Sequence, residues 1–325
     1  MSGLIRESAR RLFANLDLRD LASAAESGQW SADVWARIEV SGFLQVAAQI
    51  GEEVELDDVF DVAREVGAAA IALPVTETII AHAAASRLGL HLAPGPAALV
   101  WFENGIASRV PFGRHLSSIV GIRRVDGNVV WELLSCDQVV SNNSSNYAGE
   151  PRDTLVLRAS RVPWKLAPVD LDFEDWGAAL LCAQIAGAAA TVVSMSSQYA
   201  RDRVQFGKPI ARFQAVQHLL ARMGAESAAA DASAELASIG LAGKQSLLVS
   251  AAKARASESA GIITAIAHQV HGAMGLALEH DLPIWGRRLL SWRDEHGSEH
   301  ALNQRVGEAL LKASSADLWE GMTNL

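Results

Sequence analysis

The sequence is poor in cysteine and lacks any pattern of metal ligands. Its 325 residues include two cysteines, Cys136 and Cys182, and their spacing matches no known metal motif. We therefore expect no metal site, and a reduced, cytoplasmic compartment is the natural interpretation. The N-terminal stretch has no long apolar run followed by a small-residue cleavage site, so we expect no secretory signal.

An excess of positive charge is also missing. The chain has 28 lysines and arginines against 37 aspartates and glutamates, which gives a net charge of −9 and an isoelectric point of about 5.5. This balance argues against a general binder of nucleic acid or of an anionic membrane. Hydrophobic residues make up 50% of the chain, so it is not disordered, and its length suffices for two or three domains.

One stretch, Gly177 to Met195, is long enough and nearly uncharged enough to span a bilayer. It is rich in alanine and contains the polar residues Gln184 and Thr191. Alanine-rich helices of this kind pack closely inside helical bundles. We therefore predict a buried helix of a soluble protein here and no membrane association.

The hydrophobic pattern predicts three parts: helices over 1–95, a small β-domain over 96–168 and a helical bundle over 169–325. In the middle part, Asp126-Gly127-Asn128 lies between two β-rich runs and predicts a hairpin. Residues 154–157 predict a further strand. The last part predicts an antiparallel four-helix bundle, with helices over Phe173–Arg203, Phe213–Ile239, Lys244–Val270 and His300–Leu318.

The most informative stretch lies near residue 200. Residues 199–210 read Tyr-Ala-Arg-Asp-Arg-Val-Gln-Phe-Gly-Lys-Pro-Ile, and 213–218 read Phe-Gln-Ala-Val-Gln-His. Arginine offers a diphosphate two parallel hydrogen bonds, and Gly207 allows a close turn of the backbone. The alternative is an ordinary helix end, with Arg203 at its negative end and Gly207 as the C-cap. A second stretch, Gln-Val-His-Gly-Ala-Met-Gly, follows at 269–275.

In this order and spacing, the two stretches resemble the acyl-CoA dehydrogenase family. The resemblance implies a mainly α fold with a small β-domain: an N-terminal helical domain, a shortened antiparallel β middle domain and a C-terminal four-helix bundle. It also implies FAD as cofactor, α,β-desaturation of an acyl-CoA thioester, and an electron-transfer flavoprotein as electron acceptor.

The resemblance carries the family's contacts with the ADP half of FAD onto one set of residues, namely Arg203, Gln205, Phe206, Gln214, Gln269, Val270, His271, Gly272 and Ala273. In homo-oligomeric members these motifs reach across an interface to a flavin whose ring lies mainly in the neighbouring subunit. The family's Thr-Glu-Pro loop leading to Gly-Ser has no counterpart over residues 100–115. Part of the flavin pocket is therefore expected to be missing.

The reaction needs a glutamate that removes the α-proton of the thioester. The family's two positions for this base fall at His296 and Gly177, so neither holds a carboxylate. Glu295 is adjacent to the first position and Glu174 lies near the second. Glu295 is thus the candidate base, and the alternative is that the run Arg293-Asp294-Glu295 is a solvated or ion-paired surface feature. Trp285 and Trp292 are expected to be packing anchors.

Three hypotheses remain open. The leading one is an acyl-CoA dehydrogenase subunit that resembles the short subunit of heterotetrameric bacterial enzymes of sterol side-chain degradation, with a homologous full-length partner supplying the base. The second is a self-sufficient homo-oligomeric dehydrogenase that uses Glu295. The third is a non-catalytic structural subunit of the same fold.

Overall fold

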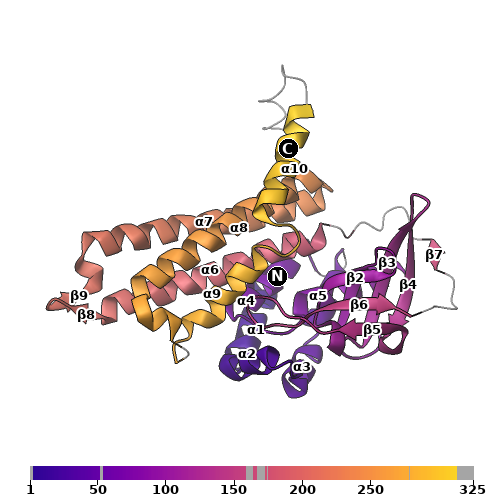
Figure 1. Ribbon diagram of the computed structural model, residues 1–325, viewed down its shortest axis with the longest axis horizontal. Helices are drawn as coiled ribbons and strands as arrows, with labels where there is room; N and C mark the ends of the chain where they lie inside the picture. The colour runs from indigo at the N-terminus through magenta and orange to yellow at the C-terminus, as the bar shows by residue number, and fades with distance from the viewer. Residues whose placement is uncertain are drawn as a thin grey trace. The chain divides into compact units, whose positions relative to one another are not determined.

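The computed structural model describes residues 3–51, 54–158, 164–166, 173, 175–277 and 279–312. The chain forms two compact units (Figure 1). The first consists of Met1–Val62 and Ile71–Gly177, and the second of Ala63–Ala70 and Ala178–Leu325. Residues 1–62 and the strands before residue 177 thus belong to one unit, while the predicted boundaries at 95 and 168 stay a prediction.

Helices build the N-terminal part, as predicted. They are α1 (Leu4–Ala14), α2 (Leu18–Glu26), α3 (Ala32–Glu39), the 3-10 helix η1 (Phe43–Gln49), α4 (Leu56–Ala68) and α5 (Val75–Arg87). The Asp17 carboxylate caps α2 by accepting from the backbone N–H groups of Arg19 and Asp20. Asp57 and Asp58 occupy the first turn of α4, where carboxylates interact favourably with the positive end of the helix dipole.

Within the described residues, the strands β1 to β7 form two sheets. The four-stranded sheet has the order β1 (Ala97–Trp101), β3 (Ser118–Val125), β4 (Asn128–Ser135) and β7 (Lys165–Leu166), and the three-stranded sheet has β2 (Ile106–Pro111), β6 (Arg152–Leu157) and β5 (Val139–Asn142). The hairpin β3–β4 is confirmed: Asp126 and Gly127 both have positive φ, 49° and 81°, as a type I′ turn requires. The sheet is not wholly antiparallel, because β1 pairs with β3 in parallel.

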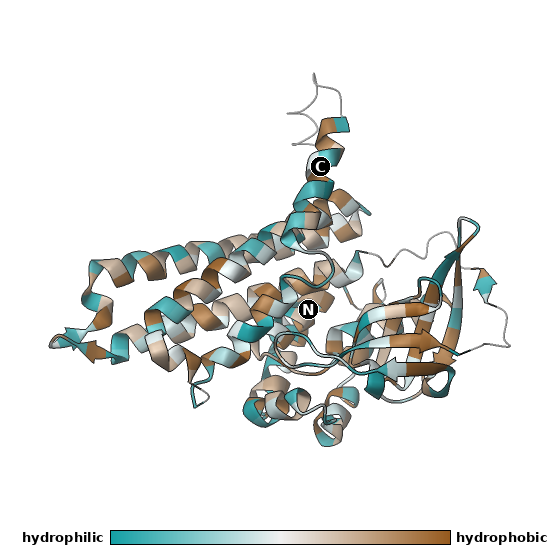
Figure 2. Ribbon diagram, viewed as in Figure 1, coloured by the Kyte–Doolittle hydropathy of each residue, from teal (hydrophilic) through white to brown (hydrophobic). Residues whose placement is uncertain are grey.

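Both sheets contribute to one apolar core. Hydrophobic residues recur along the strands of the two sheets (Figure 2). The buried members of the core are Ala98, Val100, Phe102, Ala107, Val110, Leu116, Ile119, Leu134, Val139 and Leu155. Because every strand except the two-residue β7 supplies at least one member, the β-part is held by packing between its sheets as well as by its ladders.

The second unit is helical. Its elements are α6 (Trp176–Asp202), the short strands β8 (Val204–Gln205) and β9 (Lys208–Pro209), η4 (Ile210–Arg212), α7 (Gln214–Ala242), α8 (Ser246–His271), η5 (Gly272–Leu276), α9 (Leu282–Trp292) and α10 (Glu299–Lys312). The four predicted helices are confirmed within a few residues, and α9 is an additional, shorter one. Residues 313–318 of the last predicted helix lie outside the described residues.

Helix α6 is a core helix of this unit. A Cβ on Gly67 of α4 would collide with the backbone of Gln184, and one on Gly187 of α6 would collide with the backbone of Arg64, so the two glycines let α4 and α6 approach closely. The helix is long and apolar enough to cross a membrane, but 72% of its most apolar window is buried in the structure. The predicted burial of the alanine-rich stretch is thus confirmed.

Trp285 and Trp292 of α9 are packing anchors, as predicted. Their side chains are 7% and 3% exposed. The Trp285 indole donates a hydrogen bond of 2.9 Å to the carbonyl of Ala68, and the Thr191 hydroxyl donates one of 3.0 Å to the same carbonyl. The end of α4 is therefore satisfied by side chains from α6 and α9.

Candidate functional site

The first motif forms a small hairpin at the end of α6. Val204 pairs with Pro209 and Gln205 with Lys208, and the tip residues Phe206 and Gly207 have φ values of 53° and 77°. Helix α6 ends at Asp202, so Gly207 is not its C-cap. The alternative of a plain helix stop at Gly207 is therefore wrong. The glycine serves a two-residue turn that needs positive φ.

The side chains of this hairpin face solvent. Arg203, Gln205 and Phe206 are exposed, and the Phe206 ring is 91% exposed. Within the part of the chain that the structure describes, the Arg203 side chain has no hydrogen-bond or ion-pair partner. Its neighbour Arg201, by contrast, donates to the Gln198 side chain over 2.7 Å. Arg203 is thus a solvent-facing cation with its hydrogen-bonding fork available.

Helix α7 begins beside this hairpin. Its first residue, Gln214, is exposed, and its N-cap residue Phe213 makes no side-chain capping bond. The first N–H groups of this 29-residue helix are thus not capped by their own N-cap side chain. The Phe213 ring is covered by the Lys208 ammonium at 4.4 Å, which adds a further cation at this end of the helix.

The second motif ends α8. Gln269, Gly272 and Ala273 are exposed, whereas Val270 and His271 are 7% and 3% exposed and face the bundle. Gly272 has φ 59° and ψ −141°, and a Cβ placed on it would meet no atom within 4 Å. At the end of α8 the backbone is therefore open to approach from solvent.

Tyr199 and His271 bring the two motifs together. The Tyr199 hydroxyl donates to the carbonyl of His271 over 3.3 Å, and the two rings stack with their centroids 4.4 Å apart. Nδ1 of His271 lies 2.9 Å from the carbonyl of Ala267. Burial lowers the pKa of His271. The hydrogen bond with the Ala267 carbonyl opposes this lowering, and the nearby His280 and His268 add to it. A neutral imidazole at this contact follows from its burial.

The two positions at which a base was sought lie in different elements. Gly177 is in the first turn of α6. Glu295 and His296 lie in the turn after α9, where Glu295 is half-buried and His296, with φ 52°, is exposed. Glu174 lies outside the described residues. Within the described residues, no three His, Cys, Asp or Glu side chains are arranged to hold a metal ion.

Sequence reasoning missed two residues. Tyr199 was read only as part of the first motif, although it makes the contact that joins both motifs. No role was predicted for Lys253, yet its side chain is fully buried inside the second unit. A single lysine in a long helix gives no signal of burial, because lysines usually face water.

Comparison with known proteins defines the class. Residues 170–311 match the family model "Acyl-CoA dehydrogenase, C-terminal domain". The ChsE4–ChsE5 complex from Mycobacterium tuberculosis includes a chain of the same fold, with a TM-score of 0.79 at 16% identity, over 95% of this chain and 98% of that one. Residues 170–311 thus belong to the acyl-CoA dehydrogenase family, a family of oxidoreductases, and the chain as a whole has the fold of acyl-CoA dehydrogenases.

Two curated relatives are more similar in sequence. Acyl-CoA dehydrogenase IpdE2 from Mycolicibacterium smegmatis is 28% identical over 183 residues, which are 55% of this chain and 56% of that protein. Acyl-CoA dehydrogenase FadE34 from Mycobacterium tuberculosis is 30% identical over 326 residues, which are 88% of this chain and 43% of that protein. The chain thus spans about half the length of the curated relatives it matches.

Proposed function

We propose that this chain is a subunit of an FAD-dependent acyl-CoA dehydrogenase, and that its hairpin at 203–210 and its turn at 269–273 hold the ADP half of the flavin. A homologous full-length partner would supply most of the ring pocket and the base. The substrate class is an acyl-CoA thioester, and an electron-transfer flavoprotein is the proposed electron acceptor.

The single observation that carries this proposal is that the Arg203 side chain is exposed and has no partner in the described residues. Arg203 follows the end of α6, and Tyr199 in the last turns of that helix is hydrogen-bonded to His271, next to the Gly272 turn. An arginine whose five donors are free is suited to the oxygens of a diphosphate. An arginine that only ended α6 would gain most by turning to the last carbonyls of the helix, and no such bond is formed.

The residues present fit the ADP half of a dinucleotide. The hairpin that follows Arg203 leads through η4 to the N-terminus of α7, whose N–H groups favour negative charge. Gly272 leaves space for a ligand at the end of α8. Gln214, Gln269 and Ala273 are exposed and able to contact it, whereas Val270 and His271 would contribute through their backbone, because their side chains are buried.

The need for a partner is supported by what the chain lacks. His296 and Gly177 stand where the family keeps its carboxylate, so no carboxylate of this chain matches a base position. FadE34 aligns with almost the whole of this chain, yet more than half of FadE34 remains unmatched. That remainder leaves room for a second part within one polypeptide. For this chain, the second part would be a separate partner chain. The ChsE4–ChsE5 complex, which has two named components, is a precedent for such an assembly.

The chemistry is divided accordingly. When bound, the flavin supplies the hydride acceptor for the desaturation. Arg203 and the α7 N-terminus would neutralise the diphosphate, and the Gly272 turn would let the adenosine end lie against the backbone. The Tyr199–His271 contact would keep these two binding elements in register. This chain would contribute binding and orientation, and no proton transfer.

The experiment is to express the chain alone and together with a homologous full-length subunit encoded beside it, and to measure flavin absorbance per subunit. We expect flavin only in the co-purified assembly. Stoichiometric flavin on the isolated chain would overturn the shared site, and an assembly without flavin would overturn the cofactor.

A further inference from the structure

Lys253 is a buried cation in the second unit that the proposed function does not use. It lies in α8 and its side chain is fully buried. Lysine is almost never fully buried unless its ammonium has partners, because removing a charge from water is costly. The partners of this ammonium therefore indicate why it is inside the unit.

The ammonium caps the end of a neighbouring helix. It donates to the Ser257 hydroxyl over 2.7 Å and to the carbonyl of Arg293 over 3.3 Å. The Ser257 hydroxyl donates to the same carbonyl over 3.0 Å. Arg293 is the C-cap of α9, and the last carbonyls of a helix lack partners within it and carry partial negative charge. Lys253 and Ser257 thus supply what the end of α9 lacks.

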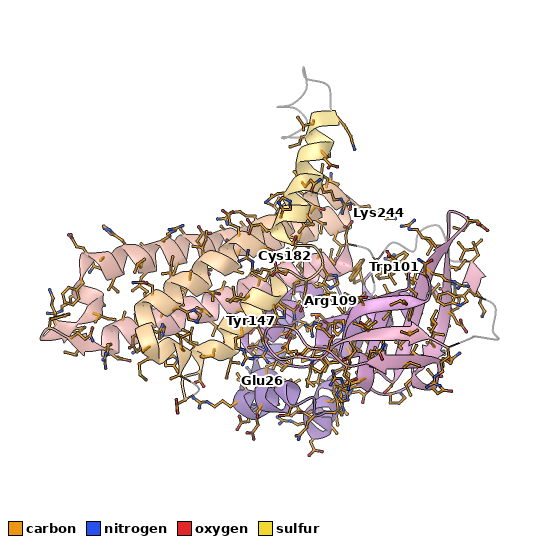
Figure 3. The ribbon with its side chains drawn as sticks, in the orientation of Figure 1. Glu26, Trp101, Arg109, Tyr147, Cys182 and Lys244 are labelled. Carbon is orange, nitrogen blue, oxygen red and sulfur yellow. The ribbon has the colours of Figure 1, made fainter. Side chains whose placement is uncertain are left out.

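The charged and titratable groups that act on Lys253 come from two elements. Cys182 of α6 is one of them (Figure 3), and Arg293, Asp294 and Glu295 of the turn after α9 are the others. Burial raises the pKa of the Cys182 thiol to about 12, so it stays neutral at pH 7 and offers no counter-charge. Asp294 and Glu295 are left as the carboxylates that favour the charged lysine.

These neighbours and the burial of the side chain together set the pKa of Lys253. Burial lowers the pKa of Lys253 to about 8, an effect that Glu295 and Asp294 oppose and Arg293 reinforces. A proton is therefore present at neutral pH. The hydrogen bond to the Arg293 carbonyl is then charge-assisted, which is the stronger kind.

We propose that Lys253 is a positioning residue: its ammonium holds the Arg293 carbonyl and thereby fixes the turn at 293–297, and Glu295 is a counter-charge to that ammonium instead of a base. The turn begins at the capped residue Arg293. The N–H of Asp294 donates to the carbonyl of Ser291, and the N–H of Glu295 donates to the carbonyl of Trp292. This gives a reason for a carboxylate at Glu295 that needs neither flavin nor substrate.

The first test measures hydrogen exchange at the amides of Asp294 and Glu295 in the full chain without flavin or acyl-CoA. Lys253→Met keeps the length of the side chain and removes the charge and the donors. We expect protection of these amides to fall about tenfold, the size of one charge-assisted hydrogen bond. Lys244→Met, at an exposed lysine, is the matched control. Unchanged protection in the Lys253 variant would overturn the proposal.

A second variant covers the case in which Lys253→Met does not fold. Ser257→Ala removes the shared hydroxyl and keeps the ammonium, so we expect a smaller loss of protection at the same two amides. A loss spread evenly over α8 and α9 would show a general packing defect and would count against a local cap.

The third test is a pH profile, which a purely structural role would not produce. Local opening of the turn breaks the bond to the Arg293 carbonyl while Lys253 stays buried. Protection at Asp294 and Glu295, corrected for intrinsic exchange rates, should therefore fall as pH rises through about 8 in the wild type and be flat in Lys253→Met. Glu295→Gln should move the midpoint to lower pH, whereas Glu258→Gln, at an exposed carboxylate of α8, should not. A midpoint that Glu295→Gln leaves in place would overturn the counter-charge. Because no readout uses flavin or turnover, this proposal and the shared flavin site can fail separately.

Discussion

The Tyr199 hydroxyl donates a hydrogen bond to the carbonyl of His271, and the two rings lie stacked at 4.4 Å. Seventy-two residues separate the two positions along the chain. Tyr199 precedes the Arg203 hairpin and His271 precedes the Gly272 turn, so one contact sets the spacing of the two elements that are proposed to bind the diphosphate and the adenosine end of the flavin. Loss of this contact should weaken the site without touching any ligand-facing side chain.

Tyr199→Phe is the direct test of that contact. It keeps the stacked ring and removes the hydrogen bond, whose loss costs about 1 kcal/mol. We expect the dissociation constant for FAD in the assembled protein to rise about fivefold. Tyr199→Ala should raise it further, since the stacking is also lost. Tyr147→Phe, at the other tyrosine of the chain, is the control and should leave flavin affinity unchanged.

Arg203→Ala tests the diphosphate contact. A hydrogen bond to a charged group contributes about 1.5–3 kcal/mol, so flavin affinity should fall roughly ten- to a hundredfold while the fold is retained. Arg203→Lys should also be impaired, because an ammonium cannot reproduce the planar fork. The quantity to measure is flavin retention on dilution, followed by fluorescence of the released cofactor.

Arg201→Ala is the matched control for Arg203, since Arg201 is exposed two residues away and is engaged with Gln198. It should retain flavin like the wild type. Equal flavin loss in both variants would indicate a general effect of charge, and equal retention would return Arg203 to a surface role.

Local sequence signals predicted much of the fold. The Asp126-Gly127 turn and the alanine-rich α6 follow from short-range rules of turn chemistry and composition, and the structure contains both. The parallel pairing of β1 with β3 was not predicted, because strand direction depends on a connection that runs over many residues.

The candidate site was predicted only as separate pieces. The motifs at 203–214 and 269–273 could be read along the chain, but the Tyr199–His271 contact that joins them is long-range. The burial of Lys253 could not be predicted either, because it depends on the packing of α6 and α9 around α8 and not on the local sequence pattern.

Lys253 should also affect stability in a pH-dependent way. Burial lowers its pKa from 10.5 to about 8, so between these values the unfolded chain holds more protons than the folded one. The contribution of this lysine to the free energy of unfolding should therefore be constant below pH 8 and rise by about 3 kcal/mol by pH 10.5.

Urea unfolding of the wild type and Lys253→Met at pH 7 and pH 10 measures that difference. The difference in unfolding free energy between the two proteins at pH 7 is the reference value. At pH 10 the wild type should gain on the variant. Cys182 is present in both proteins, so its own titration largely cancels in the comparison. If the stability difference between the two proteins were the same at both pH values, the lowered pKa of Lys253 in the folded protein would be contradicted.

Glu295→Gln separates the shared active site from a self-sufficient one. If a partner supplies the base, the isosteric change should leave turnover of an acyl-CoA within a few-fold of the wild-type assembly. If Glu295 removes the α-proton, turnover should fall by about 10²–10⁴-fold, the usual contribution of a general base. Flavin content and oligomeric state have to be equal in both preparations, so that a lower rate reports on proton transfer alone. The positive control is the corresponding Glu→Gln change at the base position of the full-length partner, which should abolish activity. A large loss in Glu295→Gln with flavin retained would make this chain the catalytic subunit.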